Sequence, residues 1–297
     1  MQSSANADLI DPPRIAVLMA CHNRRSLTCA CIKSLKLQNV NAEVDAFVVD
    51  DGSTDGTTES IRSLWTKAFL VQGNGELWWN GGMRLAWKTA KASGVPYEYY
   101  LWLNDDVVLR PGAVATLLAD ITSVQREYGE PAIIVGATED PATGQMTYGG
   151  QVIRNPRRPL RMQLLEPNGS VQPCDTLSGN CVLVSASAER TLGNLQEDFE
   201  HIFGDLDYGI RAKKNGVLLF AGSRYVGACA AHSDNLSSID RSLSRLTRIR
   251  LRLREERGIH ARDWRRFVRL HSGLGPLSIL YTLSPYLRIL LKREHRY

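Results

Sequence analysis

The sequence predicts an α/β fold, in which a mostly parallel sheet carries helices on both faces and a helical tail follows at the C-terminal end. Three observations support this. Apolar runs of strand length alternate with helix-like segments through the first two-thirds of the chain. Polar clusters follow three of these runs, and an arginine-rich segment begins near Asn235. A chain of 297 residues, 43% of them hydrophobic, can bury the core that such a fold requires.

Five apolar runs, bounded by polar residues or glycine, predict strands. In chain order they are RIAVLMAC (14–21), EVDAFVVDD (43–51), KAFLVQG (67–73), YEYYLWLND (97–105) and AIIVGAT (132–138). A helix-like segment separates each neighbouring pair. This βαβ order favours parallel pairing of the strands.

The segments between these runs carry helix signals. Leu27, Cys31 and Leu35 fall at i, i+4 and i+8, and cap residues open a second helical segment at 52–65. A third helix is expected near 83–93. In the fourth, apolar residues recur at i, i+4, i+7 and i+11, namely Leu117, Ile121, Val124 and Tyr128.

The pattern is less regular beyond residue 140. The segment 141–162 predicts turns and short antiparallel strands, and 178–193 predicts a strand and a short helix. FGDLDYGIRAKKNG (203–216) contains another helix, and two apolar runs, VLLFAG (217–222) and RYVGACAAHSD (224–234), follow it. We expect a disordered N-terminus, an α/β domain and an amphipathic helical tail, with the boundaries 1–13, 14–238 and 239–297.

Cysteine use and charge indicate the compartment and the kind of partner. The six cysteines form no CxxC pair, which is typical of reduced cysteines in an intracellular protein. The N-terminal sequence lacks the basic and apolar regions of a signal peptide. From Arg241 to Arg269, eleven arginines and three acidic residues give a charge of +8, against +5 for the whole chain. Such an asymmetry requires a partner or a surface.

Polar clusters at 21–24, 50–53 and 104–106 stand at the ends of predicted strands. Ligands of parallel α/β sheets bind at these ends, so the clusters fit one shared crevice. The adjacent carboxylates of Asp105 and Asp106 favour a bound cation, although a strand that ends in a turn is the alternative. P-loop, dinucleotide, HExxH and GxSxG motifs are all missing. A divalent cation, Mg²⁺ or Mn²⁺, would let carboxylates bind a diphosphate.

Four motifs in order resemble the family 2 glycosyltransferases of bacterial surface-polysaccharide assembly, rhamnosyltransferases among them. They are VVDDGSTDGT (48–57), LWLNDDVVL (101–109), FGDLDYGIRAKKNG (203–216) and AHSDNLS (231–237). The resemblance extends from about Arg14 to Ser238 and continues through 261–291. It implies the A-type glycosyltransferase fold, a nucleotide-diphosphate sugar donor, a divalent metal and inversion at the sugar carbon. The α/β domain is then the catalytic domain.

The resemblance also implies metal residues. Asp106 matches the metal-binding end of the family's Asp-x-Asp motif, and His232 matches a histidine near the diphosphate. The first position of the motif is Asn104, a departure that leaves one carboxylate fewer. Its amide oxygen can still face a metal-bound water or the ribose of the donor. Asp105, the middle residue, is also expected on the donor side.

Further donor contacts follow by position. Asp50 and Asp51 match the acidic motif that holds the base and ribose of the nucleotide. Cys21, Asn23 and Arg24 match the first strand-end loop, on the same side of the donor. The string DDGSTDGT is also an ordinary turn and N-cap sequence.

The resemblance places the catalytic base at Asp205. In the family, an aspartate at the start of this helix faces the acceptor and takes the proton of the attacking hydroxyl. Gly204 stands where the family usually has a glutamate. Asp207 and Arg211 are one helical turn apart and are expected to pair. A base is needed because a sugar hydroxyl is a poor nucleophile until it loses its proton.

The segment GNGELWWNGGMRLAW (73–87) is unusual in composition. Trp78 and Trp79 predict a platform for a sugar or base, with two core anchors as the alternative. Asn74 is expected on the donor side, and Arg84 could reach a phosphate.

Two alternative functions remain open in the sequence. A nucleotidyltransferase would use a similar sheet but needs a glycine-rich loop after the first strand, which ACHNRRSLT lacks. An inactive scaffold that binds nucleotide or membrane would fit the departures at Asn104 and Gly204. Nucleic acid is not an expected partner, because no module that binds it is recognisable.

The tail is expected to lie on the cytoplasmic face of a membrane, close to a lipid-linked saccharide acceptor. Within 241–257, Leu246, Ile249 and Leu253 form an apolar stripe. The arginines of another face, a pattern that suits an anionic membrane surface, are Arg241, Arg245, Arg248 and Arg252. Two prolines and an arginine interrupt the apolar stretch 274–291, so we do not expect it to span. Alternatively, the tail packs on the catalytic domain with its arginines solvated.

Overall fold

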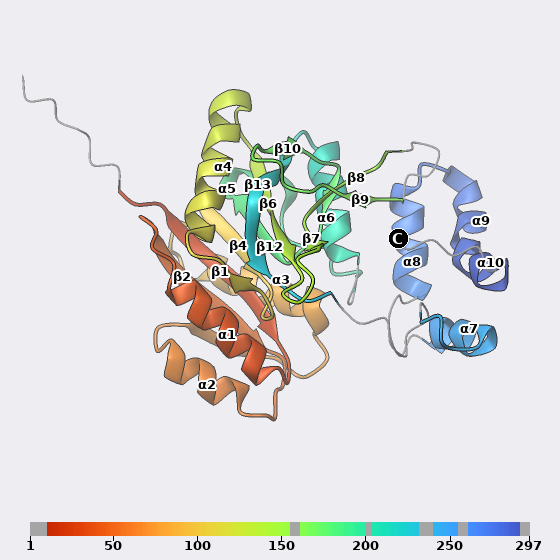
Figure 1. Ribbon diagram of the computed structural model, residues 1–297, viewed down its shortest axis with the longest axis horizontal. Coiled ribbons are helices and arrows are strands. Elements are labelled where there is room, and N and C mark those ends of the chain that lie inside the picture. Colours follow the sequence, from red (N-terminus) through yellow and green to blue (C-terminus); the bar gives the residue numbers. More distant parts are fainter. Residues whose placement is uncertain (1–10, 155–160, 200–202, 232–239, 255–260, 292–297) are drawn as a thin grey trace, which may run out of the picture.

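The computed structural model describes residues 11–154, 161–199, 203–231, 240–254 and 261–291. Within them, an α/β domain holds the first part of the chain, and a group of short helices lies beside it at the C-terminal end (Figure 1). The disorder expected over 1–13 falls almost entirely on residues 1–10, which lie outside the described residues.

A large mixed sheet forms the centre of the domain. Its main strands, in spatial order, are β10 (Gln172–Pro173), β13 (Leu218–Ala228), β6 (Ala132–Glu139), β12 (Cys181–Ser185), β4 (Tyr99–Leu103), β1 (Arg14–Cys21), β2 (Glu43–Asp50) and β3 (Phe69–Gln72). From β4 to β3 all neighbours are parallel. β12 runs antiparallel between β4 and β6, whereas β13 is parallel to β6. The predicted strand-end clusters belong to the parallel half.

Short strands extend this core. β5 (Val108–Leu109) pairs with β13, and β7 (Met146–Tyr148) pairs with β6, both antiparallel. A smaller antiparallel sheet has the order β11 (Thr176–Leu177), β8 (Gly150–Val152) and β9 (Gln163–Leu164). The turns and short antiparallel strands expected over 141–162 are confirmed where the chain is described.

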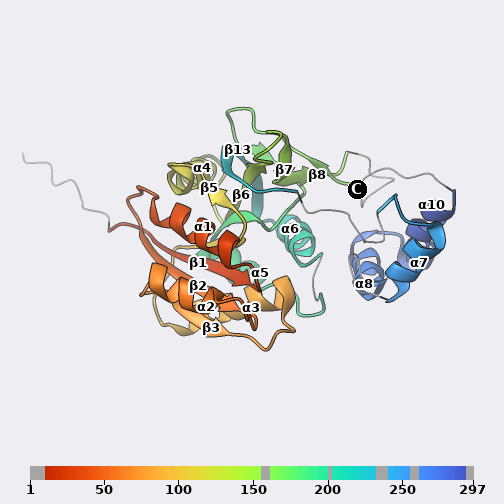
Figure 2. The same ribbon diagram turned by 60° about the horizontal axis from the view of Figure 1, so that its bottom comes forward.

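Helices cover both faces of the sheet, as predicted (Figure 2). Those that contribute buried side chains to one core cluster are α1 (Arg25–Lys36), α2 (Thr57–Leu64) and α4 (Ala113–Tyr128). Those of the other cluster are α3 (Trp78–Ala92), α5 (Ala186–Leu192) and α6 (Gly204–Lys214). Alternate strand residues enter the two clusters, with Ile15 and Val17 in the first and Ala16 and Leu18 in the second.

Three details differ from the expectations. α3 begins at Trp78, well before residue 83. Leu27 and Tyr128 are exposed, because the faces that pack on the sheet are turned slightly away from them, and Thr28 is buried on α1. β13 continues from the first of the two apolar runs, 217–222, into the second and ends at Ala228.

The C-terminal helices pack on the α/β domain through α6. They are α7 (Arg245–Arg254), α8 (Ala261–His271), the 3₁₀ helix η1 (Gly275–Leu277), α9 (Ser278–Thr282) and α10 (Ser284–Leu291). Phe199 and Phe203, just before α6, form a buried cluster with Trp264, Phe267 and Val268 of α8. The rings of Phe203 and Phe267 are stacked, with centroids 4.7 Å apart. We name this set the aromatic cluster.

A buried polar contact lies beside the aromatic cluster. Nε2 of His271 is 2.8 Å from Oδ1 of Asp207, and Nε of Arg211 donates to the other oxygen of Asp207 over 2.8 Å. The predicted pairing of Asp207 with Arg211 is confirmed, and His271 of α8 adds a second partner. Removal of any member would leave a buried polar group without its contact.

The amphipathic prediction for α7 is wrong in its orientation. Arg248 and Arg252 are 6% and 2% exposed, whereas Leu246 and Leu253 are 70% and 61% exposed. α7 packs against α10, where the guanidinium of Arg252 lies 5.8 Å from the centre of the Tyr286 ring. The side of α7 that carries Arg248 and Arg252 thus faces inward, and Leu246 and Leu253 are left at the surface.

No helix among the described residues is long and apolar enough to cross a membrane. The stretch 274–291 is divided into η1, α9 and α10, with Pro276 inside η1 and Pro285 at the second position of α10.

Candidate functional site

The carboxyl ends of β1, β2 and β4 meet at one edge of the sheet. Cys21 is in register with Asp50, and Leu18 with Trp102, so the loops that follow the three strands begin side by side. A cavity of about 360 Å³ opens at this edge. Its lining includes six residues expected from the sequence: Cys21, Arg24, Asp51, Asn104, Asp105 and Asp205.

Arg24 joins two adjacent carboxylates. Its Nη1 donates to Asp105 Oδ1 over 3.0 Å, and its Nη2 donates to Asp106 Oδ2 over 2.6 Å. Both carboxylates are nearly buried. Burial raises the pKa of Asp105 to about 6, although the charge of Arg24 acts in the opposite direction. The guanidinium is therefore the compensating cation that two adjacent buried carboxylates require.

A divalent ion would fit the chemistry of this pair. The two carboxylates already converge on one cation, Arg24, and carboxylate oxygens are the ligands that Mg²⁺ prefers. One oxygen of Asp106 accepts from Arg24, and the other accepts from the thiol of Cys229. Because both oxygens are in use, an ion bound at Asp106 would have to take the place of Arg24. In the part of the chain that the structure describes, no three His, Cys, Asp or Glu side chains surround one metal position. His232, the other expected metal residue, lies outside that part.

Asp51 holds the loop that leads into α3. Its Oδ1 accepts from the backbone N–H of Gly75 over 2.8 Å, and its Oδ2 accepts from those of Leu77 and Trp78 over 2.9 and 3.1 Å. Trp78 has a left-handed backbone with a φ of 55°, which is costly for a bulky residue. The carboxylate of Asp51 therefore starts α3 early and keeps Trp78 at the cavity.

Asn104 has a different partner from the one expected. The indole Nε1 of Trp79 donates to its Oδ1 over 2.7 Å, so this amide oxygen is already used within the chain. Trp78 and Trp79 both line the cavity. Their position agrees with a platform for a sugar or base, whereas Trp87 and Trp102 are fully buried in the core of the α/β domain.

Asp205 stands in the first turn of α6, at the wall of the cavity. Its Oδ2 accepts from the backbone N–H of Gly179 over 2.9 Å, and its Oδ1 accepts from that of Leu206 over 2.8 Å. Burial raises the pKa of Asp205, and the two hydrogen bonds lower it in part. A Cβ on Gly179 would lie 2.6 Å from the Trp79 ring and 3.1 Å from Asp205 Cβ. Only glycine permits this close approach.

Gly204 has a packing explanation. A Cβ at this position would lie 2.1 Å from Oδ1 of Asn80 and 2.9 Å from its Cγ. Asn80 is fully buried, and its Nδ2 donates to the carbonyls of Gln196 and Phe199 over 2.8 and 2.5 Å. Asn80 of α3 thus occupies the space that a side chain at position 204 would need.

We expect Gly204→Ala to lower the free energy of unfolding by roughly 1–3 kcal/mol, because the added methyl must displace Asn80 or shift α6. Asn80→Ala should also destabilise, through the loss of its hydrogen bonds. In the double variant the two losses should not add, since the shortened side chain makes room for the methyl. Chemical denaturation of the four proteins measures this coupling, and strictly additive losses would contradict the contact.

Asp50 and Asn23 do not line the cavity. Asp50 is buried, and its carboxylate accepts from the backbone N–H of Ser53 and from the hydroxyl of Thr58. Asn23 Oδ1 accepts from the backbone N–H of Thr54 over 2.7 Å. Both residues hold the strand-end loops, which is the turn chemistry that the string DDGSTDGT also allowed.

Asn74 and Arg84 lie outside the cavity lining as well. Asn74 Oδ1 accepts from the backbone N–H of Glu76, in a local turn. The guanidinium of Arg84 donates to the carbonyl of Leu195 and to the carboxylate of Glu197. Arg84 therefore fastens α3 to the segment before α6, and we no longer expect it to bind a phosphate.

Three lining residues with polar side chains were not expected as site residues from the sequence: His22, Tyr148 and Asn180. Nδ1 of His22 contacts the carbonyl of Asp51, and this histidine stood inside the first polar cluster. Asn180 directly precedes β12, whose antiparallel direction brings its amino end to the carboxyl end of β4. If β12 were parallel to β4, Asn180 would lie at the opposite edge of the sheet from the cavity. Nothing in the sequence marks Tyr148 as a cavity residue.

Comparison with known families decides the identity of this site. The model of "Glycosyl transferase family 2" matches residues 16–174, which is more than half of the chain. The chain belongs to this family. It is a glycosyltransferase, and the resemblance seen in the sequence is confirmed. The match contains Arg24, Asp105 and Asp106 but ends before Asp205.

The glycosyltransferase is also similar to a curated relative and to a solved structure. It is 28% identical over 198 residues to "N-acetylglucosaminyl-diphospho-decaprenol L-rhamnosyltransferase" of two Mycobacterium tuberculosis strains. The alignment covers 59% of this chain and 62% of the relative, which is less than two-thirds of the relative's length. S. aureus TarS 1-349 in complex with UDP-GlcNAc matches with a TM-score of 0.58 and 13% identity, over 93% of this chain and 71% of that one. This likeness confirms the expected A-type fold.

Proposed function

We propose that this glycosyltransferase moves a sugar from a nucleotide-diphosphate donor to a hydroxyl of a lipid-linked bacterial glycan. The transfer inverts the sugar carbon, and Asp205 is the general base. One observation carries the proposal. Asp205 of α6 and the Arg24–Asp105 pair, which come from distant parts of the chain, line the same cavity. A base and a charged group for the diphosphate thereby line one cavity.

In the proposed reaction, Asp205 accepts the proton of the acceptor hydroxyl while that oxygen attacks the sugar carbon. The bond between this carbon and the diphosphate oxygen breaks, and the nucleoside diphosphate leaves. Arg24 lines the cavity and can bind the diphosphate through charge-assisted hydrogen bonds. Asp105 and Asp106 would hold the divalent ion, Mg²⁺ or Mn²⁺, which when bound supplies positive charge to the departing diphosphate.

The relative supports the acceptor class. Its name contains a lipid diphosphate that carries N-acetylglucosamine, and a deoxyhexose as the transferred sugar. We therefore propose a polyprenyl-diphosphate saccharide as acceptor and a hexosyl or deoxyhexosyl donor. The family assignment favours sugar transfer over the nucleotidyltransferase and the inactive scaffold. Gly204, one of the two departures that left the scaffold open, has its space filled by Asn80.

The proposal is tested by the product that leaves. The full chain is incubated with a panel of nucleotide-diphosphate sugars, Mg²⁺ or Mn²⁺, and a polyprenyl-diphosphate N-acetylglucosamine. We expect nucleoside diphosphate to be released with one donor, at a rate that rises when the acceptor is present. Incubations without acceptor are the control. Release of pyrophosphate instead would support the nucleotidyltransferase and contradict the proposal.

We further propose that the enzyme is peripheral, on the cytoplasmic face of a membrane. A lipid-linked acceptor confines the substrate to that plane. Because Arg248 and Arg252 of α7 are buried, the cationic face first expected there is only partly available to a membrane. The support now comes from the surface of α8 and α9, where positive charge and exposed apolar side chains lie together.

A further inference from the structure

Helix α8 has two faces of opposite character. Trp264, Phe267 and Val268 are buried in the aromatic cluster. Four arginines follow at i, i+3, i+4 and i+7, a spacing that places side chains on one face of a helix: Arg262, Arg265, Arg266 and Arg269. Like charges at this spacing repel each other, so the arrangement is unfavourable unless an anion compensates it.

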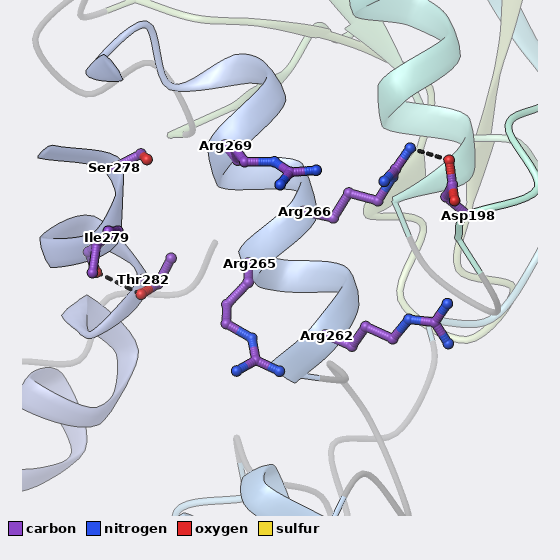
Figure 3. A pocket seen from close by; sticks show the side chains of 8 residues that line it. All are labelled: Asp198, Arg262, Arg265, Arg266, Arg269, Ser278, Ile279 and Thr282. Carbon is purple, nitrogen blue, oxygen red and sulfur yellow. Dashed lines mark hydrogen bonds and ion pairs between the residues drawn. The ribbon is translucent and has the colours of Figure 1, made fainter. Parts of the chain in front are cut away.

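All four arginines line one pocket. It has a volume of about 350 Å³ and lies between α8 and α9, with Asp198 at its edge (Figure 3). Figure 3 shows Arg266 reaching toward Asp198, with which it forms an ion pair, while Arg265 extends on the side of α9. The pocket lining thus holds four guanidinium groups and one carboxylate. Among the described residues, no carboxylate pairs with Arg265 or Arg269.

The opposite wall of the pocket is formed by α9 and combines an exposed apolar side chain with two hydroxyl groups. Ile279 of α9 lines the pocket and is 70% exposed, and its neighbour Leu280 is 64% exposed. The hydroxyl-bearing residues Ser278 and Thr282 lie on the same wall. Exposed apolar side chains continue from η1 into α10: Leu277, Leu283, Leu287, Leu290 and Leu291. Exposed apolar side chains that gather on neighbouring helices in this way indicate an interaction site.

We propose that this pocket binds the phosphate headgroup of an anionic membrane lipid, with the apolar side chains of η1, α9 and α10 in the adjoining hydrocarbon. Guanidinium groups bind phosphate oxygens in pairs, which suits the arginine wall. A soluble phosphate would use that wall alone and leave the apolar one in water. An amphiphile that carries both a phosphate and a hydrocarbon chain matches both walls at once.

This lipid site would explain how the enzyme is held at the membrane. It rests on the proposed function in one respect, namely that a lipid-linked acceptor gives the enzyme a reason to bind a membrane. Binding needs neither donor nor transfer. A failure to bind vesicles would therefore leave the transfer reaction untouched, and a chain without transferase activity could still bind them.

The test is co-sedimentation of the full chain with vesicles of phosphatidylcholine, alone or mixed with phosphatidylglycerol. We expect binding to the mixed vesicles that weakens with salt. The double variant Arg265→Gln/Arg269→Gln should bind roughly tenfold more weakly, because each arginine near an anionic surface contributes favourably. A matched control removes the same charge elsewhere, as Arg62→Gln/Arg126→Gln on α2 and α4, and should bind like the unchanged protein.

A second pair of variants tests the apolar wall. Ile279→Ser should weaken binding that persists at high salt, whereas Leu37→Ser, at another exposed site after α1, should not. All four altered arginines and both apolar residues are exposed, so the melting temperature should stay unchanged in every variant. Equal vesicle binding by the two double variants would overturn the proposal. Stabilisation of the protein by inorganic pyrophosphate without any vesicle binding would also overturn it, in favour of a soluble anion site.

Discussion

Asp205→Asn is expected to lower the rate of sugar transfer by roughly 10²–10⁴, because the amide cannot take the proton of the acceptor hydroxyl. The fold should be retained. Asparagine has the same shape, and its oxygen can still accept the hydrogen bond from the backbone N–H of Gly179. The variant also avoids the cost of burying a charged carboxylate, which is what raises the pKa of Asp205. Donor affinity, measured by calorimetry, should be unchanged. The measurement is initial rate against acceptor concentration, for the variant and the unchanged enzyme.

The pH profile separates the proposed base from a structural aspartate. Since burial raises the pKa of Asp205, the carboxylate becomes protonated at a higher pH than an ordinary aspartate. Transfer should therefore fall on the acid side above the usual aspartate range, and this limb should vanish in Asp205→Asn. Asp207→Asn is the control. It weakens the contacts with Arg211 and His271 and should lower the melting temperature while keeping the limb. Near-normal transfer by Asp205→Asn would show that the base lies elsewhere.

Asp106→Asn is expected to weaken metal-dependent donor binding by at least about 100-fold. Removal of a residue that only supports a metal ligand can lower metal affinity by this factor, and removal of a ligand itself should lower it no less. The metal-free protein should lose only a few degrees of melting temperature, since Arg24 keeps its bond to Asp105. The measurement is donor affinity by calorimetry across a Mg²⁺ or Mn²⁺ titration, paired with thermal unfolding in chelator.

Asp120→Asn provides the matched control for Asp106. Asp120 is also a buried carboxylate, and it accepts hydrogen bonds from the backbone and hydroxyl of Ser223, away from the cavity lining. It should lower stability without altering donor or metal affinity. If Asp106→Asn behaves in the same way, with a large loss of metal-free stability and intact donor binding, Asp106 is part of a turn, as the alternative interpretation held.

The strands and helices of the catalytic domain were predictable because their signals are local. RIAVLMAC gives β1 with its observed bounds, since a run of buried apolar residues ends where Cys21 meets the polar loop. The start of α3 was missed because it depends on Asp51, which caps Trp78 from a different strand end. The orientation of α7 was missed for a similar reason. Periodicity locates two faces of a helix but does not say which face meets Tyr286.

The candidate site was predictable in outline and less so in detail. Strand-end position correctly brought Cys21, Asp51 and Asp105 to one cavity, since parallel strands share an edge. The sequence could not show which of Asp50 and Asp51 lines the cavity. Adjacent residues at the end of a strand point to opposite sides, and here the carboxylate of Asp50 accepts a hydrogen bond within the turn. It also could not reveal that Asn104 faces Trp79. Such pairings arise only when distant segments meet.

The aromatic cluster changes what can be separated in this protein. Composition places a boundary at residue 239, yet Phe203 at the start of α6 has its stacking partner, Phe267, on the far side of that boundary. Because Asp205 comes two positions after Phe203, a chain cut at 238 would uncover apolar surface directly beside the proposed base. Truncation would then confuse loss of membrane contact with damage to the reaction centre. The same contact constrains chimeras with related enzymes. In any chimera that is to keep its activity, α6 and α8 must be exchanged together.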